Sequence, residues 1–513
     1  MASGMVSKSI SLGNLLPEQT LSGELTRLAI CGMAIDSRQV KSDYLFVAMQ
    51  GLQAHGKNFI AQAIANGSIA VLIDLDETLE DVSIPVIRIR DLRSRLSAIA
   101  GQFFGHPSHS MRLVGVTGTN GKTTCTYLLA QAYAAMGKKV GIMGTLGYGL
   151  LEKVEDRFTI ALRDTSMTTP DAIYSQKICA QMLDQGCELL AMEVSSHALA
   201  QKRVAGLAVD TAVFTNLTQD HLDYHGNMAA YGNAKLQLFT MPSLSLAVVN
   251  QDDPFAYKVI DCVGKHCKLI TYSLEKRHSI SARADAHLVL QDFVSSEAGM
   301  QAKLYSPEGT FHLTTSLIGR FNLSNLLAVI ASLYGQGESL DLMVSRLSKL
   351  KPVPGRMELI ANRLGVQVVV DYAHTPDALE NALVALKSNL QGKLWCVFGC
   401  GGNRDREKRP EMARLAELHA DYIVITSDNP RKEPAAQIFS DINAGLRTPV
   451  KPIVDRREAI KHAINSAKAG DVVLIAGKGH EDYQLIGDEK LPSGDQRQAR
   501  LFLRQREAEC GCA

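Results

Sequence analysis

The segment Val114–Thr124 constrains the fold more than any other part of the sequence, because three patterns meet in it. An apolar run predicted as a strand, Leu113–Thr117, leads into a glycine-rich turn, and a helix-like run, Cys125–Met136, follows directly. Glycines let backbone N–H groups approach phosphates closely, and the N-terminus of a helix favours negative charge. We therefore predict a phosphate-binding loop in which Lys122 reaches the outer phosphates and Thr123 helps to hold Mg²⁺.

This loop departs from the strict P-loop pattern, which has a glycine at the position of Val116. An ordinary tight turn that happens to carry a lysine is the alternative interpretation. The coincidence of strand, glycines, Lys-Thr pair and helix favours a variant phosphate-binding loop over that alternative.

Strand-like apolar runs alternate with helix-like stretches along the whole chain, which predicts α/β architecture with parallel sheets. A chain of 513 residues has room for several domains of roughly 100–200 residues each. Turn residues mark two candidate boundaries, a predicted linker at Gly101–Ser110 and the stretch Pro352–Gly355. We therefore predict three domains, at residues 1–110, 111–350 and 351–513.

The composition excludes several classes of protein. A net charge of +1 gives no bulk attraction to nucleic acid or to an anionic membrane. No apolar run reaches the roughly 18 residues of a membrane-spanning helix, so we expect no membrane span. The 10 cysteines have no framework spacing, which favours a reduced cytoplasmic protein over a disulfide scaffold.

Polar motifs follow four predicted strands of the last block at the point where each strand ends. The strands are Val366–Val370, Leu394–Phe398, Tyr422–Thr426 and Val472–Ala476. The motifs that follow them are Asp371–His374, Gly399–Asp405, Ser427–Arg431 and Gly477–Glu481. Because ligands bind outside the carboxyl ends of strands in open α/β sheets, these motifs predict a binding edge.

Two further polar segments follow apolar strands in the middle block. Glu193 follows one strand, and a carboxylate near a phosphate-binding loop suits Mg²⁺, although it can equally be a capping residue. The segment Asn216–Gly226 holds two aspartates and two histidines, but no companion cluster supports zinc, so a second Mg²⁺ site or a phosphate contact is the simpler interpretation. Lys235, in the helix-like stretch Ala229–Phe239, is by itself predicted as a surface lysine.

Taken together, these motifs resemble those of the Mur ligases, in order and over nearly the whole chain. The matching segments are Gly118–Thr124, Glu193–His197, Asn216–Gly226, Gly319–Asn325, Pro354–Arg356 and Asp371–Pro376. A variant phosphate-binding loop is normal in that family. The resemblance implies a UDP-substrate-binding domain at 1–110, a central P-loop ATPase domain with a mostly parallel sheet at 111–350, and a C-terminal Rossmann-like, amino-acid-binding domain at 351–513.

The resemblance also implies a reaction, with ATP as co-substrate and Mg²⁺ as cofactor. ATP would phosphorylate the γ-carboxylate of D-glutamate in UDP-N-acetylmuramoyl-L-Ala-D-Glu. The amine of meso-diaminopimelate would then attack the acyl phosphate, giving an amide, ADP and phosphate. Mg²⁺ and Lys122 would offset the crowding of negative charge during transfer. The implied setting is peptidoglycan precursor synthesis in the cytoplasm, by a monomer.

The same resemblance implies roles for individual residues. Catalysis would depend on Lys122, Glu193, His221 and Lys235. Mg²⁺ would be held by Thr123, Glu193, His221 and Lys235, the lysine as a carbamate. ATP would contact Gly118, Thr119, Asn120, Gly121, Lys122, Thr123, Thr124, Asn322, Arg356 and Asp371. The UDP-linked substrate would contact Ile35, Ser37, Leu52, Gln53, Ala54, Thr168, Thr169, Ser195, Gln201 and Arg203. The amino acid would contact Arg404, Asp428, Asn429, Pro430, Arg431, Gly477 and Glu481.

The motif Asp428–Arg431 resembles the subgroup of Mur ligases that add diaminopimelate, since lysine-adding relatives usually lack the arginine. A guanidinium matches the extra carboxylate of diaminopimelate bidentately, and an aspartate accepts from an ammonium. Asp or Asn before Pro is also a common helix start, so a helix cap is a second prediction for the same segment. Both predictions can hold together.

Three rival functions remain at this level. A lysine-adding Mur ligase and a folylpolyglutamate synthase-like ligase would share the ATPase architecture. A P-loop switch without ligase chemistry would not need the polar strand ends of the last block. Asp36–Arg38 in the first domain and the motif Asp428–Arg431 favour the diaminopimelate ligase over the folate enzyme.

Overall fold

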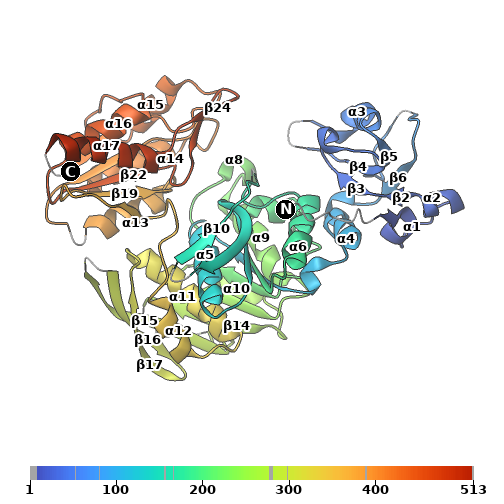
Figure 1. Cartoon of the computed structure of the whole chain (residues 1–513), viewed down its shortest axis with the longest axis horizontal. Helices are drawn as coiled ribbons and strands as arrows, with labels where there is room; N and C mark the ends of the chain where they lie inside the picture. The colour runs from blue at the N-terminus through green and yellow to red at the C-terminus, as the bar shows by residue number, and fades with distance from the viewer. Residues whose placement is uncertain are drawn as a thin grey trace. The chain divides into compact units, whose positions relative to one another are not determined.

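The computed structural model describes residues 9–51, 54–79, 81–154, 157–165, 167–275, 281–296, 299–387 and 390–510. The chain divides into two compact units, Met1–Gly115, Gly137–Thr211 and Thr240–Leu244 in the first and Val116–Met136, Ala212–Phe239 and Ser245–Ala513 in the second. Helices and strands alternate in both units (Figure 1), so the predicted α/β class is confirmed. Among the described residues, no helix is both long and apolar enough to cross a membrane.

The first unit contains a four-stranded sheet in the order β3-β4-β5-β6, with every neighbouring pair parallel. Its strands are β3 (Gly32–Ala34), β4 (Tyr44–Ala48), β5 (Ser68–Asp74) and β6 (Val86–Ile89). Around it lie β1 (Ile10–Ser11), α1 (Leu12–Leu15), α2 (Gly23–Arg27), β2 (Ala29–Ile30), α3 (Ile60–Ala65) and α4 (Leu92–Phe104). Buried residues of α1, β4, β5 and α4 share one apolar cluster, so alternate strand positions face these helices.

The predicted linker Gly101–Ser110 is wrong at its start, because α4 continues through Gly101. A Cβ atom on Gly101 would lie 3.1 Å from Nε2 of Gln176 in α6 (Ala172–Asp184), so glycine here permits two helices to pack closely. The helix ends instead at Gly105, whose φ of 77° is the left-handed conformation typical of a helix C-terminus. A glycine in the sequence can thus mark a close approach as well as a break.

A larger sheet of eleven strands contains β7 (Arg112–Thr117), which begins in the first unit and ends in the second. Its other strands in the first unit, in the order β10-β9-β8-β11, are Arg157–Ile160, Gly147–Val154, Val140–Gly144 and Leu189–Glu193. Those in the second unit, in the order β12 to β17, are Thr211–Phe214, Leu246–Asn250, Lys268–Ser273, Ala286–Ser296, Gly299–Ser306 and Gly309–Thr315.

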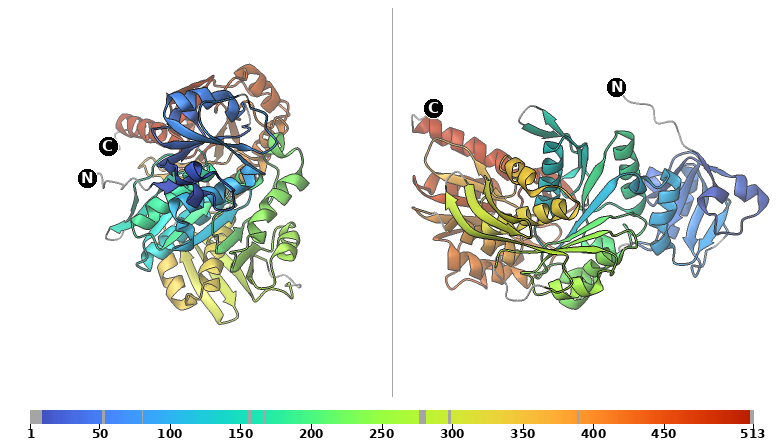
Figure 2. Two further views of the ribbon diagram at one scale, coloured as in Figure 1. Left: turned by 90° about the vertical axis from the view of Figure 1, so that its right-hand side faces the viewer. Right: turned by 90° about the horizontal axis from the view of Figure 1, so that it is seen from below.

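Pairing in this sheet changes direction toward its two ends. Strands β8 and β11 are parallel, as are β13, β14 and β15. The hairpins β8-β9-β10 and β15-β16-β17 are antiparallel. Figure 2 shows β15 to β17, in yellow-green, as long adjacent strands. The prediction of a parallel-rich central sheet is confirmed, but the sequence patterns did not indicate these antiparallel extensions.

The helices between residues 111 and 350 complete the core of that part of the chain. In the second unit they are α5 (Lys122–Ala135), α8 (Leu222–His225), α9 (Met228–Leu236), α10 (Ala256–Cys262), α11 (Arg320–Gly335) and α12 (Leu340–Leu347). Helix α11 packs on α5 and on β13 and β14, and most of its residues are buried. In the first unit, α7 (Ser196–Ala200) follows β11.

The C-terminal sheet has the order β18-β19-β22-β20-β21. Its strands are β18 (Glu358–Ile360), β19 (Gln367–Asp371), β20 (Leu394–Phe398), β21 (Tyr422–Ile425) and β22 (Val472–Ala476). All neighbours are parallel except β18 and β19. A short hairpin, β23 (Tyr483–Ile486) and β24 (Glu489–Pro492), follows β22.

Helices cover both faces of this sheet. On β20, Cys396 and Phe398 pack with α13 (Pro376–Lys387), α14 (Lys408–His419) and α15 (Ala435–Asn443). The intervening Trp395 and Val397 pack with α16 (Arg456–Ser466) and α17 (Asp495–Glu509). Strands buried on both sides are continuously apolar, which is why they could be located from the sequence. The predicted Rossmann-like arrangement is confirmed.

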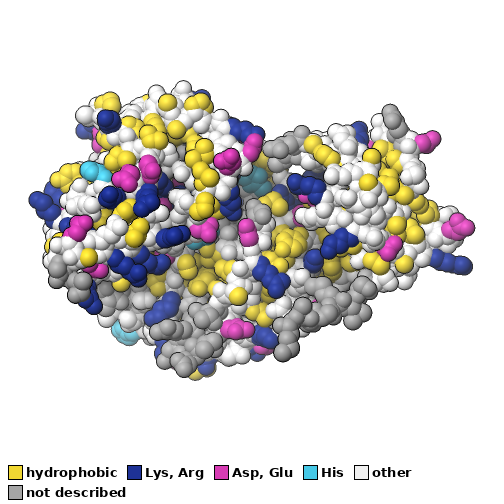
Figure 3. All heavy atoms as spheres, turned by 45° about the horizontal axis from the view of Figure 1, so that its top comes forward, with side chains coloured by type: hydrophobic (Ala, Val, Ile, Leu, Met, Phe, Trp, Pro, Cys, Tyr) yellow, Lys and Arg dark blue, Asp and Glu magenta, His cyan; other side chains and the backbone are white. Residues whose placement is uncertain are grey.

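Charged side chains of both signs are interspersed on the face shown in Figure 3. This distribution agrees with the net charge of +1 and with the absence of a bulk electrostatic preference.

Candidate active site

The predicted phosphate-binding loop lies between the end of β7 and the start of α5. Gly118 and Gly121 have φ values of 154° and 86°. A Cβ atom would lie 1.9 Å from Oγ1 of Thr215 at the first position and 2.4 Å from Oδ1 of Asn325 at the second. Both positions therefore require glycine, for backbone conformation and for space. The loop turns into α5 at Lys122, so its backbone N–H groups lie at a helix N-terminus.

Lys122 bends back over the loop that it ends. Its Nζ donates to the carbonyl oxygens of Gly118 at 2.9 Å and Thr119 at 2.8 Å. The adjacent Thr123 accepts a hydrogen bond from Nη2 of Arg356 at 3.0 Å. The structure thus brings together a residue of the predicted loop and one of the predicted ATP contacts more than two hundred positions later.

Arg356 also lies beside a second group of predicted ATP contacts. Its guanidinium lies 4.2 Å from the ring centroid of Tyr372. The preceding Asp371 accepts from the backbone N–H groups of Met357 at 2.7 Å and Ala373 at 2.8 Å. Burial raises the pKa of Asp371 above its ordinary value, against the opposing effect of Arg356. Asn322, on α11, donates to the carbonyl of Ile318 at 2.8 Å.

A cavity of about 500 Å³ lies between part of the loop and the segment that holds Arg356 and Asp371, and its wall does not include Lys122, Thr123 or Asn322. The predicted ATP contacts in its wall are Asn120, Gly121, Thr124, Arg356 and Asp371. Its wall also contains Phe321 and Tyr372, which lie in predicted motifs but had no individual role, and Asp252, Asp377 and Asn381, which lie outside those motifs. Asp377 accepts from Nδ2 of Asn120 at 2.7 Å and directly follows the motif Asp371–Pro376, so extending that motif by one residue would have found it.

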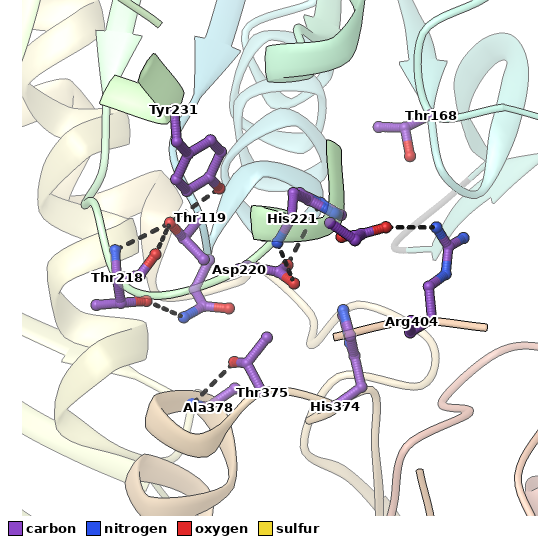
Figure 4. A network of polar contacts seen from close by, with 12 residues as sticks. Thr119, Thr168, Thr218, Asp220, His221, Tyr231, His374, Thr375, Ala378 and Arg404 are labelled. Atoms are coloured by element: carbon purple, nitrogen blue, oxygen red, sulfur yellow. Dashed lines mark hydrogen bonds and ion pairs between the residues drawn. The ribbon is translucent and has the colours of Figure 1, made fainter. Parts of the chain in front are cut away.

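A network of ionisable groups lies beside this loop (Figure 4). Nε2 of His221 is 3.3 Å from Oδ2 of Asp220, and Lys408 donates to the carbonyl of His374 at 2.9 Å. Burial opposes the charge on Asp220, but His221, Lys408 and His374 outweigh it and lower the pKa of this carboxyl. Burial, aided by Lys408, lowers the pKa of His374.

Lys235 is buried, so its prediction as a surface lysine is wrong. Only 1% of the residue is exposed, because α9 packs its Nζ against the loop, where it donates to the carbonyl of Gly118 at 2.8 Å. Nζ also lies 4.3 Å from the ring centroid of Tyr231. Burial, followed by repulsion from Lys122, lowers the pKa of Lys235 well below its ordinary value. Burial at this position therefore favours the neutral form of the amine over the ammonium.

Of the predicted Mg²⁺ residues, Thr123 and Glu193 supply the oxygen donors that this ion prefers, whereas His221 offers a ring nitrogen and Lys235 would supply oxygen only as a carbamate. Glu193 ends β11 in the first unit, is 1% exposed, and accepts from Thr145 through N–H at 2.8 Å and Oγ1 at 3.0 Å. Thr123 and His221 belong to the second unit. Within the described part of the chain, no three His, Cys, Asp or Glu side chains are grouped to hold a metal without other ligands.

The residues assigned to the muramoyl-dipeptide side form a connected group in the first unit. Arg203 donates to the carbonyl of Thr169 at 2.8 Å and to Oε1 of Gln201 at 2.7 Å. The N–H of Ser195 donates to Oγ1 of Thr169 at 3.0 Å. Thr168 joins the group through Oγ1 of Thr145 at 3.1 Å.

The UDP contacts predicted earlier in the chain lie in the small sheet domain. Ile35 directly follows the strand β3, and Ser37, two residues later, donates to Oε1 of Gln62 at 2.7 Å. The carbonyl of Ala54 accepts from the N–H of Gly51 at 2.9 Å. Leu52 and Gln53 lie outside the described residues.

The motifs Ser427–Arg431 and Gly477–Glu481, which are predicted to bind the incoming amino acid, meet at one end of the C-terminal sheet. Nδ2 of Asn429 donates to Oε2 of Glu481 at 3.0 Å. The buried Lys478, which sequence reasoning missed, bridges Oδ1 of Asn429 at 3.1 Å and Oε2 of Glu481 at 3.0 Å. Gly477, at φ 118°, leaves room for Asp428, whose Oδ2 would lie 2.7 Å from a Cβ atom there. Lys478 stands inside the motif Gly477–Glu481, so its position was indicated although its role was not.

Arg431 and Arg404 bring two guanidinium groups to the same end. Burial lowers the pKa of Arg431, and Arg404 lowers it further by repulsion, while Asp428 and Glu481 oppose both effects. Nη1 of Arg431 donates to the carbonyl of Gly402 at 3.0 Å. Arg404 also lies 4.0 Å from Asp223.

The helix cap predicted for Asp428–Arg431 is wrong. The next helix, α15, begins only at Ala435, after Pro434. Arg431 has a φ of 54° and lies in the loop before that helix, and the Asn429 amide accepts from the N–H of Leu485 at 2.9 Å. The polar groups of this segment therefore hold a loop against the hairpin β23–β24.

Three family models match the chain in succession. They describe the Mur ligase family catalytic domain at residues 29–104, the Mur ligase middle domain at 116–333 and the Mur ligase glutamate ligase domain at 355–479.

Individual relatives match nearly the full length. The UDP-N-acetylmuramoyl-L-alanyl-D-glutamate–2,6-diaminopimelate ligase of Coxiella burnetii is 43% identical over 478 residues, covering 92% of this chain and 96% of that protein. The ligase of the same name from Xanthomonas oryzae pv. oryzae is 46% identical over 487 residues, covering 94% of each. A solved structure of a ligase with this name is similar with a TM-score of 0.68 and 36% identity, over 98% of this chain and 100% of the other.

The loop, its cavity and the polar ends of the C-terminal sheet, together with these matches, define the class: this is an ATP-dependent ligase that forms amide bonds. The chain belongs to the Mur ligase family.

Proposed function

We propose that this ligase adds meso-diaminopimelate to UDP-N-acetylmuramoyl-L-Ala-D-Glu, as a cytoplasmic monomer in peptidoglycan precursor synthesis. The observation that carries the proposal is the grouping of Arg404 and Arg431 with Asp428 and Glu481. Diaminopimelate has two carboxylates and two amines. Guanidinium groups bind carboxylates bidentately, and aspartate or glutamate accepts from ammonium, so this set of side chains complements both ends of that amino acid. The names of the relatives support the same substrates.

In the first step of the proposed reaction, a γ-carboxylate oxygen of the D-glutamate attacks the terminal phosphorus of ATP, and ADP leaves. The loop Gly118–Lys122 receives the phosphates at the N-terminus of α5, while the N–H groups of Thr119 and Asn120 fix the loop by donating to Asn216. Nζ of Lys122 leaves its two carbonyl partners to neutralise charge on the transferring group. The muramoyl-dipeptide is assigned to the connected group of Thr168, Thr169, Ser195, Gln201 and Arg203, and the UDP part to Ile35, Ser37, Leu52, Gln53 and Ala54.

In the second step, the neutral amine of diaminopimelate attacks the carbonyl carbon of the acyl phosphate. Phosphate leaves, and the nitrogen loses a proton to give the amide. The side chains of Asp428, Glu481 and Arg431 orient the amino acid, and the buried Lys478 holds Asn429 and Glu481 in place. Orientation of two bound reactants supplies much of the rate enhancement in such a step.

Mg²⁺ would be held by Thr123, Glu193, His221 and a carbamate on Lys235, and it would supply charge neutralisation at the phosphates. The carbamate forms when the neutral amine adds CO₂ and releases one proton. Support comes from the burial of Nζ and the lowered pKa of Lys235. A carbamate would place negative charge where an ammonium would repel the metal ion.

Lysine is the second candidate substrate, because it differs from diaminopimelate mainly by the distal carboxylate. Bound lysine would leave Arg431 without the partner that this proposal assigns to it. Folylpolyglutamate synthase from Mycobacterium tuberculosis is similar with a TM-score of 0.60 and 18% identity, over 75% of this chain and 92% of that protein, which shows the shared fold alone.

The test is a panel of amino acids, each with UDP-N-acetylmuramoyl-L-Ala-D-Glu and MgATP, with the product identified by its mass. We expect a product with meso-diaminopimelate at a far higher kcat/KM than with lysine. A product with lysine or glutamate instead would reassign the substrate. ATP turnover without any amide product would contradict ligation altogether.

A further inference from the structure

A buried ion pair lies beneath the amino-acid-binding loops of the C-terminal sheet. Arg456, the first residue of α16, and Asp495, the first residue of α17, are 2% and 1% exposed. Nε of Arg456 lies 2.8 Å from Oδ1 of Asp495, and Nη2 lies 2.7 Å from Oδ2, which is a bidentate pairing.

The same guanidinium binds the last residue of β22 and a residue that lies two positions after the end of β21. Nη2 of Arg456 donates to the carbonyl of Ala476 at 2.8 Å, and Nη1 donates to the carbonyl of Ser427 at 3.3 Å. Ala476 directly precedes Gly477, and Ser427 directly precedes Asp428. One side chain therefore contacts the residue before each of the two amino-acid-binding motifs.

These two strand ends are not neighbours in the sheet. The order β19-β22-β20-β21 places β20 between them, so no ladder hydrogen bond joins β21 to β22. The separation of Asp428 from Gly477 and Glu481 is consequently not set by the sheet alone. Arg456 bridges the ends of β21 and β22, and its ion pair with Asp495 fixes the orientation of its guanidinium.

We propose that Arg456 and Asp495 are a positioning pair that sets the spacing between the motifs Asp428–Arg431 and Gly477–Glu481, and so determines affinity for the incoming amino acid. This inference rests on the assignment of those motifs to the amino acid. Neither residue is assigned a contact with substrate. Arginine is required because lysine cannot bind one carboxylate bidentately and two carbonyls at the same time.

The test compares Arg456→Lys with a control that destabilises the other end of the same sheet. Asp471 precedes β22 at its opposite end and accepts from the N–H of Lys393 at 2.8 Å and from Nε1 of Trp395 at 3.3 Å. Asp471→Asn should lower the midpoint of thermal unfolding without changing the amino-acid site. The measurements are that midpoint, and kcat and KM for meso-diaminopimelate and for ATP in full-length enzyme.

For Arg456→Lys we expect kcat/KM for diaminopimelate to fall by about 10²-fold, mostly through KM, because a displacement near 1 Å of positioning groups costs about that much. KM for ATP should match that of Asp471→Asn. Should the lysine variant fail to fold, Asp495→Asn retains the arginine and the size of its partner, and the same change in KM is expected.

Three outcomes separate the possible failures. A wild type that joins no amino acid to the UDP-linked dipeptide contradicts the proposed function itself. An active wild type, with Arg456→Lys and Asp471→Asn equal in KM for diaminopimelate, overturns the positioning role alone. Equal losses for ATP and diaminopimelate in the lysine variant would also overturn it, because they would indicate general structural damage.

Discussion

Lys122 and Lys235 both donate to the carbonyl oxygen of Gly118, yet they are assigned opposite charges during the reaction. Lys122 ends the loop and lies beside solvent, whereas Lys235 is enclosed by α9 and the loop. Burial, followed by repulsion from Lys122, lowers the pKa of Lys235 and so favours its neutral form.

Replacing Lys122 by alanine should abolish ligation and leave the fold intact. Its ammonium is expected to stabilise charge on the transferring phosphoryl, and the loss of one such group costs about 10²–10³-fold in kcat. Phosphate release and far-UV circular dichroism are the measurements. Turnover at the wild-type rate in a folded variant would contradict the phosphate-loop assignment.

Replacing Lys235 by alanine should also remove most activity, but for a different reason. The carbamate would be lost, and small carboxylic acids added to the assay should restore part of the activity by supplying an anion. The matched variant Lys235→Arg returns only positive charge and should not be rescued. Full activity of the arginine variant would exclude the carbamate.

Among the elements, the loop that carries Arg431 shows most clearly what sequence patterns can and cannot predict. The strands before the motifs were located within one residue because they are apolar on both faces. The loop itself was partly predicted as a helix cap, and the structure shows a left-handed turn bound to a hairpin. Asp-Asn-Pro is compatible with both, and the deciding contact comes from Leu485, 56 positions after Asn429.

Arg431 should determine the preference for diaminopimelate over lysine. A site that binds a substrate group through a dedicated polar partner rejects the analogue lacking that group by roughly 10⁴-fold, less where water reaches the pocket. Arg431→Ala should lower kcat/KM for diaminopimelate and narrow the gap to lysine, while KM for ATP stays nearly constant. Arg431→Lys should recover little, because a point charge does not reproduce the bidentate geometry.

The measurement is kcat/KM for both amino acids in the wild type and the two variants. If Arg431→Ala retains the wild-type preference, the distal carboxylate is bound elsewhere, and Arg404 becomes the next residue to test.

For the whole molecule, the sequence predicted the α/β class and the parallel-rich sheets, because strand and helix periodicities are local. It did not predict the antiparallel strands β15 to β17 or the burial of Lys235. Both depend on which distant elements pack together. The same holds for Lys478 and Arg456, whose partners are ordinary polar residues until the fold brings them together.

Stability of the C-terminal domain should depend on pH through Asp441. Hydrogen bonds from Arg406, with further help from Gln437 and Arg409, lower the pKa of Asp441 to about 2. A carboxyl with a lowered folded-state pKa stabilises the fold above its unfolded value of 3.8, and this contribution is lost as pH falls toward about 2. Asp441→Asn should therefore lower the denaturation midpoint near neutral pH, by a modest amount because solvent screens its exposed partner Arg406, and by less at about pH 3.

Trp395 is the single tryptophan of the chain and lies in the same domain, so its fluorescence reports unfolding of this part alone. The denaturation midpoints of wild type and Asp441→Asn are compared at the two pH values. A difference that stays constant between them would show that the Asp441 charge contributes nothing to stability.

The hairpin β23–β24 offers a route by which substrate choice can change over evolution or in the laboratory. The N–H of Arg431 donates to the carbonyl oxygen of Leu485 at 3.0 Å, and the carbonyl oxygen of Arg431 accepts from the N–H of Gly487 at 2.8 Å. The outer strand, Glu489–Pro492, is exposed along its whole length. Substitutions in this strand would leave the hydrophobic cores and the phosphate-binding loop unchanged. They would shift the backbone that orients the guanidinium of Arg431. A library confined to this hairpin would explore amino-acid selectivity while leaving ATP chemistry and foldability unchanged.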